Sequence, residues 1–179
     1  TLVARGAELD EVFACAAEES ARLLGIEAAA VLQYLDADRA VVVGVHRNGG
    51  GRLLPVNAEL DFDRAGSVLG HVLTTRAPAR VADYDRSRGE FPEVMRRMGF
   101  SVSVGAPVLV DGEPWGAIVG SSAEEDALPP GRERRVVALA ELVAQAVVND
   151  RRWTELTASR TRLLEAGDET RRRLESGLH

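Results

Sequence analysis

The stretch GAPVLVDGEPWGAIVGSS, residues 105–122, carries apolar runs on both sides of Asp111-Gly112. Asp-Gly adopts the positive φ angles of a tight two-residue β-turn more readily than most dipeptides. Val, Ile, Leu and Ala on both sides of such a turn favour extended strands. The sequence therefore predicts a hairpin of two strong strands, 102–110 and 114–122.

The segments before this hairpin alternate between helical and extended patterns. Apolar residues within 7–24 recur mostly at helical spacing, and Gly25 ends the pattern. Pro55 favours the edge of a sheet for the weak strand that contains it. The order predicts an α+β fold with a central antiparallel sheet flanked by helices. The other expected elements are strands at 28–36, 39–46 and 52–60, a helix at 66–75, a strand at 79–84 and a helical segment at 91–99.

After the hairpin the pattern is helical to the end of the chain. Pro129-Pro130 open the predicted helix, and no Pro follows them. A helix of about 45 residues is about 70 Å long, so its later half needs a partner beyond one small domain. Two stripes at seven-residue spacing support a parallel coiled coil that Arg160 and Gly167 weaken, although a frayed end has the same pattern. The stripes are Leu139, Ala146, Trp153, Arg160, Gly167, Leu174 and Leu142, Asn149, Leu156, Leu163, Thr170, Gly177.

The composition excludes several classes of protein. A chain of 179 residues suits one domain with an extension. The net charge of −6, with scattered Arg and no Lys, gives no reason to expect nucleic-acid binding. The single Cys15 allows neither a disulfide nor a zinc cluster, and we expect it to be a small buried hydrophobe.

The ends of the chain and its longest apolar runs bear on its location. No apolar run approaches the length that spans a bilayer, and we expect no signal peptide, because no basic start is followed by an apolar core. These features fit a cytoplasmic protein. The start at Thr1 without a Met indicates a fragment of something longer.

The order of the elements, with the 105–122 stretch among them, resembles a GAF domain. The resemblance covers about residues 7–150 and implies the α/β/α arrangement of GAF and PAS-like domains. It divides the chain into a GAF sensory domain at 1–150 and, at 151–179, a coiled-coil linker with the start of a dimerisation and histidine-phosphotransfer helix.

The tail ASRTRLLEAGDETRRRLESGLH, residues 158–179, resembles the phosphoacceptor helix of bacterial two-component sensor histidine kinases related to nitrate sensors. The resemblance implies that His179 is the phosphoacceptor, that the C-terminal helix forms a homodimer, and that a cognate response regulator is a partner. Ser176-Gly177 departs from the usual charged pair. The matching positions are Glu169, Arg171, Arg172, Arg173, Leu174, Glu175, Leu178 and His179.

The chemistry expected of His179 is phosphoryl transfer. A neutral imidazole can attack a γ-phosphorus when ATP and Mg²⁺ are presented in line. ATP and Mg²⁺ would serve the parent kinase, whereas this chain has no cofactor of its own, lacks an ATP-binding domain and should be inactive alone. The alternatives are an idle exposed His and a ligand-free GAF dimerisation module of a transcription regulator or phosphatase.

The resemblance also implies a ligand pocket under segments 62–75 and 84–100. These segments hold four of the scarce aromatic residues and both Met, which predicts an adaptable apolar pocket for a small molecule such as a fatty acid, a quinone or a tryptophan-like compound. The alternative is a plain core under a lid, and no metal site is expected. The predicted lining is Phe62, Val68, His71, Val72, Tyr84, Phe91, Val94, Met95, Met98 and Phe100.

Other ligands and sites are weaker hypotheses. Haem would need a pocket His; the matching segment 85–100 has none, which leaves His71 as a weak candidate ligand. The Asn-Lys-Phe-Asp-Glu signature of cyclic-nucleotide binders is absent, and Cys15 is too far from the pocket to link a bilin. Arg96-Arg97 face either an anion or solvent. Trp153 is either a dimer anchor or packs on its own domain.

Overall fold

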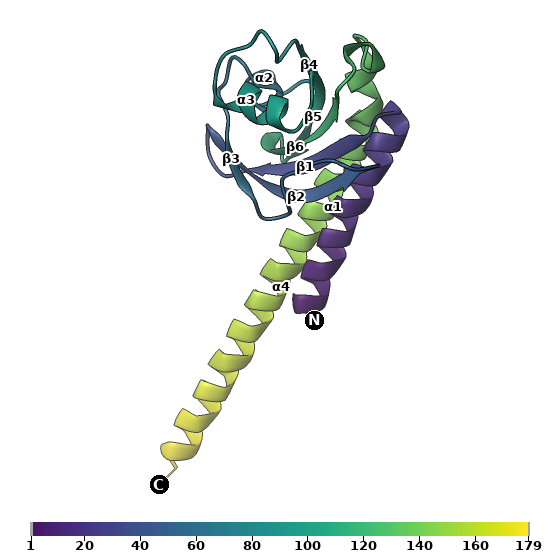
Figure 1. Cartoon of the computed structure of the whole chain (residues 1–179). Helices are drawn as coiled ribbons and strands as arrows, with labels where there is room; N and C mark the ends of the chain where they lie inside the picture. Colours follow the sequence, from purple (N-terminus) through teal and green to yellow (C-terminus); the bar gives the residue numbers. More distant parts are fainter. Residues whose placement is uncertain (1, 179) are drawn as a thin grey trace.

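The computed structural model describes residues 2–178, with side chains from residue 6 onward (Figure 1). His179 lies outside the described residues. Six antiparallel strands form one sheet in the order β3-β2-β1-β6-β5-β4. Helices cover both faces, so the predicted α+β fold is confirmed. The elements are α1 Leu2–Leu24, β1 Ala28–Tyr34, β2 Arg39–Arg47, β3 Glu59–Asp61, α2 Val68–Thr75, β4 Ala79–Ala82, α3 Glu90–Arg97, β5 Val102–Val110, β6 Glu113–Ser122 and α4 Val137–Ser176.

The predicted hairpin is the pair β5–β6. Asp111 and Gly112 have φ angles of 53° and 78°, the positive values that a tight hairpin turn requires. The two strands pair from Val102 with Ser122 to Val110 with Glu113. The hairpin therefore supplies two of the four inner strands of the sheet.

The predicted strand at 52–60 is wrong over most of its length, because only Glu59–Asp61 forms a strand. Pro55 has no N–H to donate, and Asn57 turns into the left-handed region with a φ of 72°. Two backbone bonds still hold this segment to β2, from Asn57 N to the Val42 carbonyl at 2.8 Å and from Val42 N to the Ala58 carbonyl at 2.9 Å. It is an irregular flap along the sheet edge.

The long helix begins later than Pro129-Pro130 predict. Gly131 has a φ of 96°, and a 3₁₀ segment at Arg132–Val136 precedes α4. From Val137 the helix runs for 40 residues without a break. Figure 1 shows it continuing far beyond the sheet.

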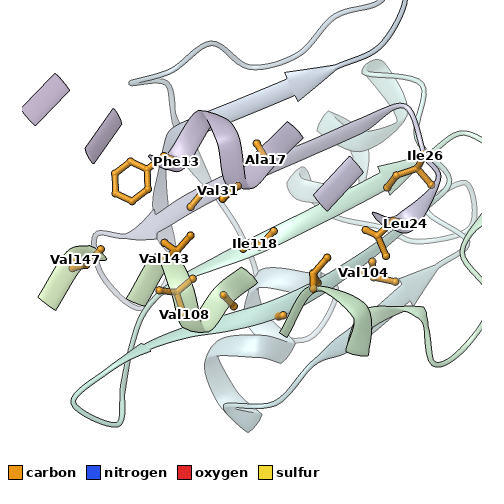
Figure 2. Packing of buried hydrophobic residues seen from close by; sticks show 14 of the residues in the cluster. Phe13, Ala17, Leu24, Ile26, Val31, Val104, Val108, Ile118, Val143 and Val147 are labelled. Carbon is orange, nitrogen blue, oxygen red and sulfur yellow. The ribbon is translucent and has the colours of Figure 1, made fainter. Parts of the chain in front are cut away.

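Helices α1 and α4 lie side by side on one face of the sheet (Figure 1). Figure 2 shows their inward residues interdigitating with those of the strands. Phe13 of α1 stacks on Trp115 with ring centroids 5.5 Å apart. Gly44 of β2 lies directly below, where a Cβ would come within 2.5 Å of the Phe13 carbonyl. Close packing thus fixes α1 on what we call the helical face.

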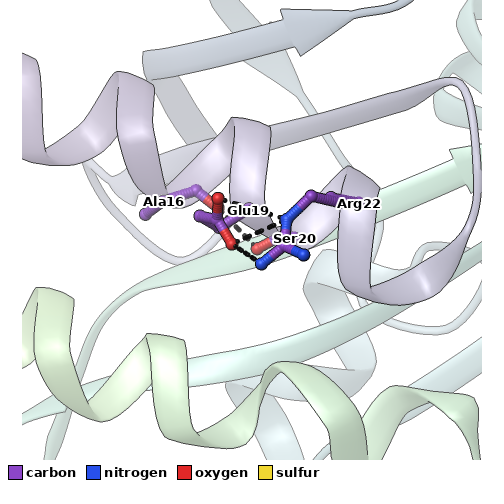
Figure 3. Close-up of polar contacts among 4 residues, drawn as sticks. All are labelled: Ala16, Glu19, Ser20 and Arg22. Carbon is purple, nitrogen blue, oxygen red and sulfur yellow. Dashed lines mark hydrogen bonds and ion pairs between the residues drawn. The ribbon is translucent and has the colours of Figure 1, made fainter.

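Two polar contacts of α1 are made within the helix itself (Figure 3). The buried Ser20 hydroxyl donates to the Ala16 carbonyl at 2.6 Å, and the Arg22 guanidinium pairs with Glu19 on the exposed side. The expected burial of Cys15 is wrong: its side chain is exposed, because Phe13, Ala16, Ala17 and Ser20 occupy the inward positions of the helix.

Helix α4 has two parts with different surroundings. Its first turns bury Ala140, Val143 and Val147 against the sheet. Beyond Asp150 the described side chains are exposed apart from the partly buried Thr157. Within residues 2–178 no helix is long and apolar enough to cross a membrane.

Candidate functional site

A small cavity lies on the face of the sheet opposite α1 and α4, between the strands, α3 and the flap at 52–58. Its volume is about 60 Å³. Every described lining residue except Ser121 is apolar. The lining consists of Ala28, Ala29, Ala30, Leu32, Val42, Val45, Leu53, Leu54, Leu60, Leu69, Phe91, Val94, Met95, Met98, Phe100, Val119 and Ser121.

Side-chain alternation along β6 explains how the sheet forms one wall of this cavity. Val119 and Ser121 point into it, whereas Ile118, next to Val119, points into the core under α1 and α4. Gly120 also faces the helices, since a Cβ there would meet Leu24 and Ile26. One strand therefore contacts the cavity and the helical core with successive side chains.

Helix α3 forms the roof of the cavity. Glu90 and Glu93 in its first turn and Arg96 and Arg97 in its last turn complement the helix dipole. Its inward face buries Phe91 and Met95, which are 3% and 4% exposed. The helix is thus amphipathic, and its apolar side closes the cavity.

The two arginines of α3 do not share an anion site. Arg96 donates to the Tyr84 carbonyl and, at 2.8 Å, to the Ser87 carbonyl, so it holds the segment before the helix. Arg97 pairs with Glu93 at 2.5 Å on the exposed side. Main-chain carbonyls account for Arg96, and the ion pair with Glu93 accounts for Arg97.

The residues predicted to line a pocket separate into three groups. Phe91, Val94, Met95, Met98 and Phe100 line the cavity. His71 does not: it lies on the exposed side of α2, because the neighbouring Leu69 and Val72 take the inward positions. Phe62, Val68, Val72 and Tyr84 are buried in the hydrophobic cluster on the same face of the sheet but do not line the cavity.

Sequence reasoning missed the contributions of the strands and the flap. The apolar pair Leu53-Leu54 beside the glycines at 49–51 was a usable signal, since two adjacent leucines in a loop need something to cover. The small run Ala28–Ala30 was another, because alanines on a sheet leave space above them. Neither signal shows which strands lie next to each other.

Polar groups lie close to one end of the cavity. Ser121 Oγ and Ser103 Oγ are 2.7 Å apart. The Tyr84 hydroxyl beside Ser103 is buried and has no hydrogen-bond partner among the described residues. Burial raises the pKa of Tyr84 well above its ordinary value, which the Ser103 hydroxyl partly offsets, so the phenol stays protonated and can donate.

The cavity does not suit the large ligands considered from the sequence. About 60 Å³ is far below the several hundred Å³ typical of cofactor pockets. His71 is outside it, and Cys15 is on α1 across the sheet. In the described part of the chain no group of three His, Cys, Asp or Glu residues could hold a metal ion.

A second candidate surface runs along α4. Leu142, Leu156, Leu163 and Leu174 are 65%, 67%, 71% and 66% exposed. Steps of seven or eleven residues return to one side of an α-helix, so these leucines form a stripe, which we call the α4 stripe. Trp153 lies within it and is 46% exposed.

Solved structures with this architecture define the class of fold. The PixJ GAF domain of Thermosynechococcus elongatus in its blue-light-absorbing form aligns at a TM-score of 0.64 and 12% identity, over 89% of this chain and 94% of that one. The phycocyanobilin-bound GAF domain of a cyanobacterial phytochrome aligns at 0.59 and 19%, over 83% and 92%. The GAF domain of an Acinetobacter phosphoenolpyruvate-protein phosphotransferase aligns at 0.62 and 12%, over 82% and 86%.

The sequence comparison is more specific than the fold. The model of the GAF domain family matches residues 8–147. The chain therefore belongs to the GAF domain family. Among curated proteins none matches the sequence significantly.

Proposed function

We propose that this chain is the sensory and dimerising region of a cytoplasmic two-component sensor histidine kinase of the nitrate-sensor type. A small-molecule or redox signal in the GAF domain changes a helical dimer and so the access of ATP to His179. The observation that carries the proposal is the row of exposed leucines Leu156, Leu163 and Leu174 on α4, which leads into the Arg-rich tail that resembles a phosphoacceptor helix.

The α4 stripe supports a homodimer. Helices owe most of their stability to packing of an apolar face, and Leu156, Leu163 and Leu174 of α4 are largely exposed in the described chain. Burying one exposed leucine contributes about 1.5–3 kcal/mol. A second copy of α4, with Leu156 and Leu163 in the seam, supplies that burial in both chains at once.

The chemistry at His179 follows from the dimer. In the parent protein the neutral imidazole of His179 would attack the γ-phosphorus of ATP, the bond from that phosphorus to the β,γ-bridging oxygen would break, and ADP would leave; Mg²⁺ would neutralise the charge on the phosphates. The ATP-binding domain belongs to the parent protein, and a response regulator would receive the phosphoryl group. This chain alone is expected to be inactive.

The arrangement of the layers supports coupling between ligand and helix. Strand β6 contacts the cavity through Val119 and the core under α4 through Ile118. A ligand that spreads the cavity therefore acts on a sheet to which α4 is packed directly. Such a signal requires two arrangements of α4 whose balance the ligand shifts.

The test is autophosphorylation of the full-length protein with labelled ATP, compared in His179→Gln and His71→Gln variants. His71 is an exposed histidine on α2 and serves as the matched control. We expect acid-labile label in the native protein and in His71→Gln, and none in His179→Gln. Label that persists in His179→Gln places the phosphoacceptor elsewhere, and no label in any of the three overturns the kinase assignment.

The small volume of the cavity favours a second candidate function. With only about 60 Å³ of space, the GAF domain could bind nothing and serve as a dimerisation module in a transcription regulator or phosphatase. That function predicts a stable dimer through the α4 stripe, no phosphorylation of His179, and no response of the dimer to small molecules.

A further inference from the structure

The cavity face of the sheet carries a row of residues that spans four strands. Arg47 of β2 pairs with Ala28 of β1, Ala28 pairs with Ser121 of β6, and Ser121 pairs with Ser103 of β5. Neighbouring strands are about 4.8 Å apart, so Arg47 and Ser121 start about 10 Å from each other. Ala28 between them has only a methyl group and lines the cavity. The row therefore places a cation and a hydroxyl on opposite sides of a small apolar floor.

Arg47 has no carboxylate partner among the described residues. Its Nη1 donates to two main-chain carbonyls, that of Arg52 at 2.7 Å and that of Met98 at 3.4 Å. Its Nε is buried without a hydrogen-bond partner. A guanidinium has five N–H donors and usually finds a carboxylate or phosphate when it is partly buried. Arg47 thus retains an unused capacity to bind an anion.

The contacts of Arg47 place it at the edge of the cavity. Its guanidinium carbon is 4.9 Å from the centroid of the Phe100 ring, and Phe100 lines the cavity. Met98, whose carbonyl it approaches, is another lining residue. Arg52 directly precedes the lining pair Leu53-Leu54. The cation therefore lies where the flap, α3 and β2 meet.

The hydroxyls on the other side can donate into the cavity. In the Ser103–Ser121 pair either oxygen can be the donor. The Tyr84 phenol is protonated and lies beside Ser103 without a hydrogen bond in the described structure, and a small shift of either side chain would let it donate to Ser103. Ser103 then donates to Ser121, and the Ser121 O–H is free for an acceptor in the cavity. This order satisfies all three buried hydroxyls only when such an acceptor is present.

We propose that the cavity binds a small monocarboxylate whose alkyl or aryl body lies among the apolar lining and whose carboxylate lies over Ala28, between Arg47 and Ser121. The proposal rests on the sensory role proposed above and names its ligand class. Arg47 exchanges its bonds to the Arg52 and Met98 carbonyls for charge-assisted bonds to the carboxylate, which are stronger.

The size of the cavity limits the body of the ligand. About 60 Å³ suits a short or branched acid rather than a long fatty acid. Met95 and Met98 in the roof are flexible and can make room for a few more carbons. The absence of further polar lining residues in the described chain disfavours amino acids and dicarboxylates, whose second charged group would be buried unpaired.

The test compares isovalerate with isovaleramide, which has nearly the same shape and no charge. Binding of each to the 179-residue chain is measured by calorimetry and by chemical shifts of the Met95 and Met98 methyl groups. Charge-assisted bonds to a carboxylate predict that isovalerate binds about 10- to 100-fold more tightly than the amide. Isobutyrate, hexanoate and phenylacetate define the size limit, and acetate controls for charge without an apolar body.

Variants of single residues show whether the affinity for isovalerate depends on the Arg47 guanidinium or on the overall charge of the protein. Arg47→Gln should weaken isovalerate binding about 10- to 100-fold and leave isovaleramide unchanged. Arg52→Gln, at an exposed position on the flap, is the matched control and should change neither. Arg47→Lys should recover part of the lost affinity. Ser121→Ala, which leaves Arg47 and the flap in place, should cost about 3- to 10-fold.

Three outcomes overturn the ligand class: equal affinity for acid and amide, full affinity in Arg47→Gln, or no binding of any acid in the series. Thermal unfolding of each variant checks that loss of affinity is not loss of fold. The measurement does not involve His179, so binding without phosphorylation refutes the kinase and retains the ligand class. Phosphorylation without binding of any acid refutes the ligand class and retains the kinase.

Discussion

The two faces of the sheet differ in the length of the elements that cover them. One face lies under α1 and α4, with 23 and 40 residues, and its core is built from long interdigitating rows (Figure 2). The other lies under α2 and α3, with eight residues each, and the flap at 52–58. Long helices place a side chain over the strands at every turn, whereas short elements leave space where they meet. The cavity lies where α3, the flap and the strands meet.

The polar groups follow the same division. The orphaned Arg47 Nε and the unpartnered Tyr84 hydroxyl are both on the cavity side, and so is the Ser103–Ser121 pair. On the helical face the buried Ser20 is satisfied within its own helix. Buried polar groups without partners are costly, so their concentration on one face points to a site rather than to chance. The comparison can be tested one face at a time.

The largest expected difference comes from truncating one large side chain on each face. Phe13→Ala removes a ring that is 4% exposed and stacked on Trp115, so it should lower the free energy of unfolding by about 3–5 kcal/mol. Met98→Ala at the partly exposed edge of the cavity should cost about 1 kcal/mol. Urea unfolding of both variants measures the gap, and equal losses would contradict the division between the faces.

A smaller effect is expected from adding one methyl group to each face. Val104 is fully buried under the helices, so Val104→Ile should destabilise the protein by about 1–3 kcal/mol through overpacking. Val119→Ile extends into the cavity and should be neutral or stabilise by about 0.5 kcal/mol. The same chemical change thus has opposite signs on the two faces. If Val119→Ile destabilised as much as Val104→Ile, the cavity would not be open to a ligand.

The exposed part of α4 should contribute least to the folding of the domain. Leu156→Gln and Leu163→Gln should shift its stability by no more than about 0.5 kcal/mol, because neither residue contacts the sheet. Both should weaken the proposed dimer strongly, which sedimentation at several concentrations detects. Arg162→Gln, on the same helix, is the control. A monomeric native chain would remove the argument for the α4 stripe.

The smallest effect concerns the turn between β1 and β2, which belongs to neither face. The Arg39 guanidinium, with the Asp38 side chain and backbone N–H, lowers the pKa of Asp36 to about 2 from an ordinary 3.8. The ionised carboxylate therefore stabilises the fold above pH 4, and this contribution is lost between about pH 4 and pH 2. Asp36 in turn raises the pKa of Asp38, which offsets part of the effect.

The Asp36→Asn variant keeps the acceptor for the Asp38 and Arg39 N–H groups and removes the charge. Unfolding midpoints at pH 4 and pH 2.5 should fall slightly more in the native chain than in this variant. An equal fall in both would show that the ion pair with Arg39 adds nothing measurable, as many exposed pairs do.

Local signals in the sequence were sufficient for most of the fold. Asp111-Gly112 determined the hairpin, because few dipeptides accept two positive φ angles in succession. Gly25, with a φ of 70°, ended α1 as expected. The helical segment expected at 91–99 corresponds to α3, and Phe91 and Met95, expected in the pocket, lie on its inward side. These features depend on neighbours in the chain, which a sequence displays.

The site required long-range register, which a sequence does not display. A bulge between Val31 and Leu32 leaves Val43 without a partner in the β1–β2 pairing. That one-residue shift brings Val45 and Arg47 to the cavity face, because a slip of one residue reverses the side on which every later side chain lies. Without the bulge, the row from Arg47 to Ser103 cannot be inferred. The exposure of His71 was missed for a simpler reason. A helix of about two turns has too few residues for their apolar spacing to show which side faces inward.

The length of α4 has a mechanical consequence. Only its first turns, as far as Val148, are anchored on the sheet, and the helix ends at Ser176. The part of α4 beyond Val148 is therefore about 42 Å long at 1.5 Å per residue, and a tilt of about 5° at the anchor moves its tip by about 4 Å. A displacement of that size at the tip is larger than the length of a hydrogen bond, although the rearrangement at the anchor is under an ångström per turn. The helix therefore acts as a lever: sub-ångström repacking at the sheet becomes a displacement of its tip large enough to make or break a hydrogen bond there.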